Sequence, residues 1–236
     1  MNLYALKISV RYILLTLIIF LIPITSQASL IFINEIHYDN SGADKGEFVE
    51  IAGTAGLNLL DWSLQFYNGS TGYLYKTYTI DDVTFGDTNN GFGFLAFEVS
   101  GIQNGSANGI GDGIAIVDSN DQVLQFISYE GAFEAKDGAA LGILSNNIPI
   151  SQSSSPEGKS MQLTSSGYNY NDFEWALEDN TYGSKNIGQS FIHDQFPITV
   201  QVSEPNLQVS FILLIILLFL SRKRVNIAKI KHRTID

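Results

Sequence analysis

The chain has 236 residues, no cysteine and a net charge of −11. Every acidic residue except Asp236 lies within residues 29–205, which hold 23 acidic residues against five lysines and no arginine, so this segment has a net charge of −18. Such a charge repels phosphate backbones and argues against a nucleic-acid partner. Without cysteine, the segment must fold on a hydrophobic core, for which it is long enough.

The first 28 residues have the layout of a secretory signal peptide. Lys7 and Arg11 precede an apolar run over residues 12–24, and small side chains stand at Ser26 and Ala28. This order predicts cleavage by signal peptidase after Ala28. An uncleaved N-terminal anchor is the alternative.

Residues 29–189 read as one β-domain. Short runs rich in Ile, Val, Phe, Tyr and Leu alternate with clusters of Gly, Asn, Ser and Asp, and no sustained helical period is present. The predicted strands cover residues 30–38, 47–51, 62–67, 73–80, 92–99, 114–117, 123–129, 159–163 and 173–176. Many short strands separated by turns predict an all-β fold, a sandwich of two sheets with Trp62 in its core.

One strand offers residues that could do chemistry. Glu35, His37 and Asp39 alternate, so a strand would place them on one face, where they could bind a metal or move a proton. No second histidine lies nearby in sequence, which favours an ordinary solvent-exposed face of an edge strand, with Asn34 and Glu35 hydrogen-bonded to nearby backbone groups. We therefore predict no catalytic residue and no enzymatic activity.

Two turns are rich in oxygen ligands. Asp39 and Asp44 bracket one, and Asp118 and Asp121 bracket the other. Calcium takes about 6–8 oxygens from such loops, so these four aspartates are the candidate calcium ligands, and no other cofactor is expected. The alternative is that Asp and Asn stand there only because they favour turns.

The C-terminal part reads as a membrane segment. Residues 190–206 contain two prolines and predict a stalk, and residues 207–221 are mostly apolar and predict a transmembrane or sorting helix. Arg222, Lys223 and Arg224 open a basic tail over residues 222–236. Because such clusters stay on the cytoplasmic side, the acidic domain is expected outside the membrane.

Two stretches carry a resemblance to a known domain family. Residues 33–36 (Ile-Asn-Glu-Ile), 47–51 (Glu-Phe-Val-Glu-Ile) and 59–64 (Leu-Leu-Asp-Trp-Ser-Leu) open the domain, and residues 158–163, 173–175 and 181–186 close it. Their order resembles that of lamin-tail domains. The resemblance implies an immunoglobulin-like β-sandwich of the kind found on exported proteins, including extracellular nucleases. It implies no shared catalytic residue.

A second resemblance lies at the C-terminus. Ser203, Glu204 and Pro205, the apolar helix and the basic cluster look like the Pro-Glu-Pro (PEP-CTERM) sorting signal that exosortases read in Gram-negative bacteria. Ser203 stands where that family has its first proline, and the chain continues past the basic cluster, so a plain membrane anchor stays open. The resemblance implies a cell-envelope location, with the domain outside the inner membrane, at the cell surface or secreted.

Together these features predict an exported, envelope-anchored or surface-displayed module with a non-catalytic binding or structural role. Its expected partners are the membrane, signal peptidase, an exosortase, and an extracellular protein or polysaccharide. The alternative is an accessory module of extracellular nucleic-acid degradation.

Overall fold

The computed structural model describes residues 30–105, 110–152 and 155–192. Within these ranges no helix is long and apolar enough to cross a bilayer. The predicted signal peptide, transmembrane or sorting helix and basic tail lie outside the described residues.

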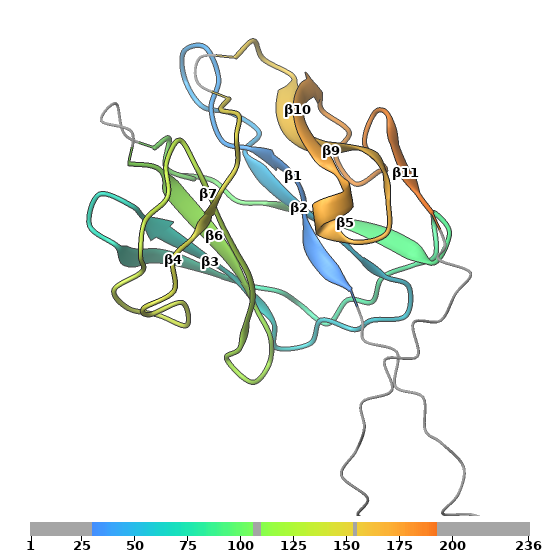
Figure 1. The fold of residues 1–236 in the computed structure, drawn as a ribbon, viewed down its shortest axis with the longest axis horizontal. Helices are drawn as coiled ribbons and strands as arrows, with labels where there is room; N and C mark the ends of the chain where they lie inside the picture. The colour runs from blue at the N-terminus through green and yellow to red at the C-terminus, as the bar shows by residue number, and fades with distance from the viewer. Residues whose placement is uncertain (1–29, 106–109, 153–154, 193–236) are drawn as a thin grey trace, which may run out of the picture. The chain divides into compact units, whose positions relative to one another are not determined.

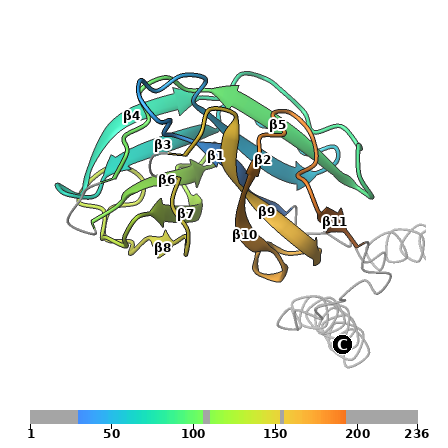
Figure 2. The same ribbon diagram turned by 90° about the horizontal axis from the view of Figure 1, so that it is seen from above.

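The described chain is a sandwich of two β-sheets (Figures 1 and 2). The first sheet has the order β10-β9-β1-β2-β5, with β11 paired to β9, and the second has the order β4-β3-β6-β7-β8. The first sheet contains β1 (Ile31–His37), β2 (Phe48–Thr54), β5 (Phe92–Glu98), β9 (Lys159–Gly167), β10 (Glu174–Asp179) and β11 (Gln189–Phe191). The second contains β3 (Ser63–Asn68), β4 (Tyr73–Thr79), β6 (Asp112–Val117), β7 (Val123–Tyr129) and β8 (Asn146–Asn147). The predicted all-β sandwich is confirmed.

Each of the nine predicted strands corresponds to an observed strand, with ends that differ by a few residues. The sequence did not indicate β8, β11 or the short 3-10 helix η1 (Tyr170–Asp172). β8 and β11 have two and three residues and pair in parallel with β7 and β9, so they form only because a longer strand is already there. β11 also crosses the expected boundary between the domain and the stalk at residue 189.

The main core lies between the two sheets. Alternate residues of the facing strands supply it, such as Ile36 and Ile51 from the first sheet and Leu64 and Ile116 from the second. This is the period of two that a strand with one buried face requires. Trp62 precedes β3 and packs against this core while half-buried, so it contributes less than a fully enclosed side chain.

A second apolar cluster covers the outer face of the first sheet. Its centre is Phe191 in β11, which is 1% exposed. The ring of Phe191 lies 4.4 Å from that of Phe92, 5.1 Å from that of Phe173 and 5.6 Å from that of Phe94, between ring centroids. β1 and β2 are therefore buried on both faces over almost their whole length.

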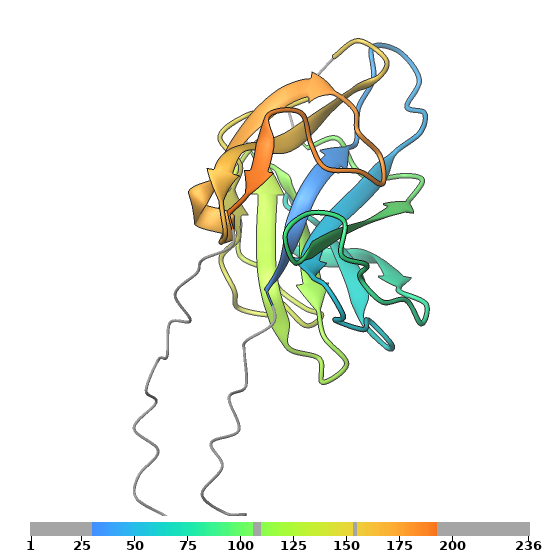
Figure 3. The same ribbon diagram turned by 90° about the vertical axis from the view of Figure 1, so that its right-hand side faces the viewer.

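The described chain enters and leaves the sandwich at the same end. β1 runs antiparallel to β9, whereas β11 runs parallel to it, so β1 begins where β11 ends (Figure 3). The β1–β2 loop and the start of β9 therefore lie at the opposite end.

We expect Phe191→Ala to lower the free energy of unfolding by about 3–5 kcal/mol, because it empties the centre of the outer aromatic cluster. Ile192→Ala is the matched control, since Ile192 is the next residue and is 55% exposed. Urea unfolding followed by tryptophan fluorescence measures both. Equal stability of the two variants would mean that β11 does not pack on the sheet in solution.

Candidate functional site

The strongest concentration of buried polar side chains lies between the first sheet and residues 180–189. We call this group the polar layer. Its members are Asn34, Glu35, Glu50, Ser160, Gln162, Asn186 and Gln189, all of which are buried. Sandwich strands usually present such side chains to water, so their burial here needs a physical account.

The pairing of β1 with β2 brings the two carboxylates of the polar layer together. A register shift between Ile33 and Glu35 sets Glu35 directly opposite Glu50. Val49 and Ile51, on either side of Glu50, belong to the core between the sheets. Glu50 therefore points to the outer face of the sheet, where residues 180–189 cover it.

Glu50 is held by donors from both sides. Its Oε1 accepts a hydrogen bond from Asn34 Nδ2 at 2.9 Å, and its Oε2 accepts one from the backbone N–H of Gly183 at 2.7 Å. Asn34 Oδ1 in turn accepts one from Gln189 Nε2 at 2.7 Å. Burial raises the pKa of Glu50 to about 8, an effect that the hydrogen bonds from Asn34 and Gly183 oppose and the nearby charge of Glu35 strengthens.

Glu35 is also occupied by donors from the chain. The hydroxyl of Ser160 donates to Oε1, the backbone N–H of Thr181 donates to the same oxygen at 2.9 Å, and Thr181 Oγ1 donates to Oε2 at 2.7 Å. Burial raises the pKa of Glu35, and these hydrogen bonds partly offset it. Glu35 bonds to backbone as expected, but at Thr181, 146 positions away, whereas the side chain of Asn34 bonds to the side chains of Glu50 and Gln189. The expected solvent-exposed face of an edge strand is wrong, because β1 pairs with both β2 and β9 and because Glu35 and His37 are buried under a covering segment.

Asn186 fills a gap between two strands. β1 and β9 pair only at Glu35–Gln162 and Ile36–Met161. Beyond that point, Asn186 Nδ2 lies 2.9 Å from both Asn34 O and Leu163 O and donates to these carbonyls of β1 and β9. The side-chain amide thus replaces the missing backbone hydrogen bonds.

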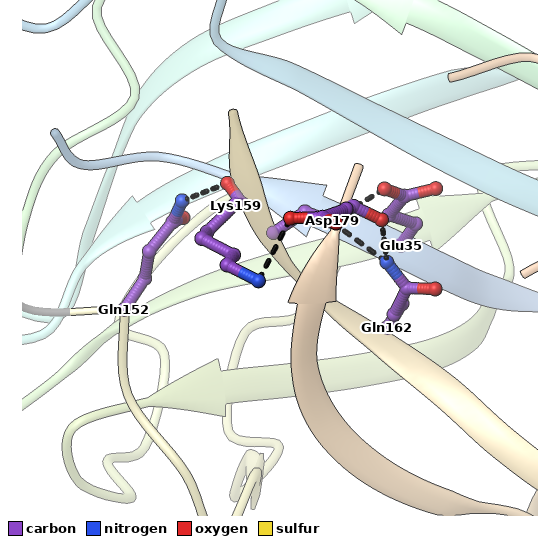
Figure 4. A network of polar contacts seen from close by, with 6 residues as sticks. Glu35, Gln152, Lys159, Gln162 and Asp179 are labelled. Atoms are coloured by element: carbon purple, nitrogen blue, oxygen red, sulfur yellow. Dashed lines mark hydrogen bonds and ion pairs between the residues drawn. The ribbon is translucent and has the colours of Figure 1, made fainter. Parts of the chain in front are cut away.

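Side-chain amides also donate to backbone carbonyls around the start of β9 (Figure 4). Gln162 Nε2 donates to Asp179 O at 2.8 Å, and Gln152 Nε2 donates to Lys159 O at 2.6 Å. Lys159 Nζ and Asp179 Oδ1 form an ion pair at 2.7 Å, but both side chains are substantially exposed. Such a pair adds little to stability.

His37 is buried and contacts two loops. Its Nε2 lies 3.0 Å from Lys45 O, and its Nδ1 contacts Gln152 Nε2. Asn40 Nδ2 lies 3.2 Å from the same Nε2, so the ring joins three separate parts of the loops at this end of the sandwich. Gln152 also accepts from the backbone N–H of Tyr38 at 2.8 Å. No local pattern pointed to Gln152, because it lies in an irregular Ser-rich stretch.

The four candidate calcium ligands lie in two separate turns. Asp118 Oδ1 accepts from the backbone N–H groups of Asn120 and Gln122, each at 2.8 Å, and these bonds lower its pKa. Asp44 accepts from Asn40 N–H at 3.3 Å and from Asn104 Nδ2 at 3.0 Å. Within the described ranges no group of three or more His, Asp or Glu side chains could hold a metal ion. Calcium at Asp39, Asp44, Asp118 or Asp121 stays a prediction.

The two turns lie at opposite ends of the sandwich. Gln125 Oε1 accepts from Ile33 N–H at 2.7 Å, and the ring of Tyr129 stacks 4.2 Å from that of Tyr38. β7 therefore runs alongside β1 in the same direction. The turn before β7, with Asp118 and Asp121, lies at the entry to β1, whereas Asp39 and Asp44 follow its exit. The four aspartates cannot form a single site.

The polar layer thus holds a segment in place. Each oxygen of Glu35 and Glu50 accepts a donor from the chain itself, and no buried side-chain nitrogen or oxygen of the described residues lacks a partner. A carboxylate in this state joins strand to loop, and a proton or metal could reach it only by displacing one of these bonds.

Comparisons of the chain with protein-family models, with curated proteins and with solved structures find no match.

We expect the domain to be more stable at about pH 5 than at about pH 8. Burial raises the pKa of Glu50 in the folded protein to about 8 from its ordinary value of 4.5, so the folded state binds more protons across this interval and stability falls as pH rises. The slope that one such group adds is at most about 1.4 kcal/mol per pH unit. The raised pKa values of Glu35, Glu47 and Asp112 act in the same direction.

Thermal unfolding as a function of pH measures this effect. Glu50→Gln keeps the size of the side chain without its titration and should flatten the profile. Glu174→Gln, at an exposed position of β10, should leave the slope unchanged. A Glu50→Gln protein with the slope of the wild type would show that Glu50 titrates normally.

Proposed function

We propose that this chain is an exported protein of the bacterial cell envelope and that its β-sandwich is a non-catalytic binding or structural module. In this proposal the sandwich is immunoglobulin-like, of the lamin-tail type. A stalk and a C-terminal helix tether it outside the inner membrane of a Gram-negative bacterium.

The observation that carries the proposal is the use of the polar side chains. Glu35 and His37, the residues that the sequence offers for catalysis, are buried and bonded to loops. Catalytic carboxylates and imidazoles need access to substrate or to a proton acceptor beyond the protein's own scaffold. Here Glu35 and His37 stabilise the fold instead. This supports a module that binds a partner through its surface and has no catalytic site among these buried groups.

The position of the chain ends supports the tether. Both ends of the described chain lie at one end of the sandwich. The loop between β1 and β2 and residues 99–105, which follow β5, lie at the other end, where a tethered module would present them. The net charge of −18 for residues 29–205 favours a partner that is neutral or basic over one rich in phosphate.

We expect deletion of residues 207–236 to release the protein from the membrane fraction, because the described residues include no helix able to span a bilayer. Fractionation with an antibody against the domain measures this. Changing Glu204 and Pro205 to alanine separates the two readings of the C-terminus. An exosortase substrate should accumulate as a full-length precursor in the inner membrane, whereas a plain anchor should behave as wild type. A truncated chain still found wholly in the membrane would contradict both readings.

We expect the purified chain to leave linear DNA intact in the presence of magnesium, manganese or calcium. The reason is that Glu35 and His37 are engaged in the fold and the domain repels the phosphate backbone. Gel electrophoresis measures the outcome. Cleavage by the wild type that is lost in a folded Glu35→Gln or His37→Gln variant would favour a role in nucleic-acid degradation instead.

A further inference from the structure

The surface of the second sheet carries an apolar turn that faces solvent. Residues 141–144, Leu-Gly-Ile-Leu, are all exposed. Leu141 is 64% exposed and Leu144 is 67% exposed, the highest values for large hydrophobic side chains among the described residues. A run of exposed apolar residues of this length is unfavourable in water and indicates a contact with another apolar phase.

The turn is held in this position by its backbone. Gly142 N–H donates to Ala135 O and Ile143 N–H donates to Ala140 O, each at 2.8 Å. Ala140, which is buried, donates its N–H to Tyr67 Oη at 3.1 Å. The apolar cluster beneath already contains Phe126 and Phe133. The exposed side chains are therefore presented outward by a fixed scaffold.

The surroundings of the turn indicate a neutral partner. Residues 138–156 include no charged side chain. At the base of the turn stand Glu134, Lys136 and Asp137, and Asp137 Oδ1 is engaged by the N–H of Leu74 at 2.6 Å. Lys136 Nζ lies 6.0 Å from the centre of the exposed Tyr73 ring. These groups give no positive field that would attract phosphate-rich or anionic surfaces.

We propose that residues 141–144 insert into the boundary of the acyl chains of a lipid bilayer with zwitterionic headgroups. Four residues are far fewer than the roughly 20–30 per side of a stable protein interface, so this turn is too small to hold a second copy of the chain by itself. A bilayer accepts a small apolar insertion, with Tyr73 at the level of the headgroups. The inference rests on the proposed tether, which keeps the domain beside the membrane and raises the local concentration of lipid.

The chain has no cysteine, so one introduced cysteine can carry a single environment-sensitive fluorophore. We would place it at Leu141→Cys in the full chain, reconstituted into phosphatidylcholine vesicles. Leu177→Cys is the matched control, because Leu177 is 40% exposed on β10 of the other sheet. Nitroxide-labelled lipid should quench the probe at position 141 and leave the probe at position 177 unquenched. High salt should not weaken the quenching, since the contact is apolar.

Adding Leu144→Asp to the Leu141→Cys chain should lower the inserted fraction about tenfold, the ratio expected for losing the burial of one leucine. Chains that float with the vesicles while the probe at position 141 stays aqueous would overturn the insertion and leave the tether intact. Chains that do not float with the vesicles would overturn both. Protection of the probe that depends on protein concentration and not on lipid would assign the turn to self-association and also overturn the proposal.

Discussion

Buried carboxylates that accept hydrogen bonds from the backbone of loops hold this sandwich together. Glu50 binds Gly183 N–H and Glu35 binds Thr181 N–H. Glu47 binds the N–H groups of Gly101 and Ile102, and Asp112 binds those of Gly69 and Gly105. Irregular loops leave N–H groups without partners from a strand, and a carboxylate accepts two or more of them at once. The cost is the desolvation of the charge, which raises the pKa of all four groups.

This arrangement explains why β1 and β2, in the middle of the first sheet, are buried on both faces. One face of β1 and β2 meets the second sheet, as in any sandwich. The other is covered by residues 180–191, polar where they lie over Asn34 and Glu50 and aromatic where Phe191 lies over Phe92. Hydrogen bonds in the polar layer require each partner at a defined distance, whereas packing in an aromatic cluster tolerates small shifts. The polar contacts therefore set the position of residues 180–191, and Phe191 adds burial of apolar surface.

The outer face of the second sheet is covered in a different way. Residues 133–140 cover Tyr67 and Phe126 with an apolar cluster, but the adjoining turn exposes leucines where turns usually carry polar residues. The contrast separates two kinds of surface on one module. Over the first sheet the covering segment completes the fold: Asn186, Gln189 and Phe191 are buried and bind or pack within the chain, while Tyr182 and Ile187 are exposed. Over the second sheet, backbone hydrogen bonds hold the covering segment in place. Its outermost side chains, Leu141 and Leu144, remain exposed to solvent.

The sequence by itself determined the parts that depend on local patterns. Alternation over residues 62–67, where Leu64 and Phe66 are buried, predicted a strand, because a period of two follows from strand geometry alone. The acidic charge of residues 29–205 and the turn-forming aspartates were equally plain.

Only the tertiary structure decided which polar residues are buried and what they bind. Gln152 lies 114 positions from Tyr38, Asn186 lies 152 positions from Asn34, and Gly183 lies 133 positions from Glu50. Glu35 and His37 look the same in the sequence whether they face solvent or a covering segment. β11 shows the same limit, since three residues have too little pattern to predict a strand and pair only because residues 165–167 of β9 extend past its pairing with β10 and β1. Burial of a polar group is settled by what folds over it, and that is a property of long-range contacts which local sequence does not encode.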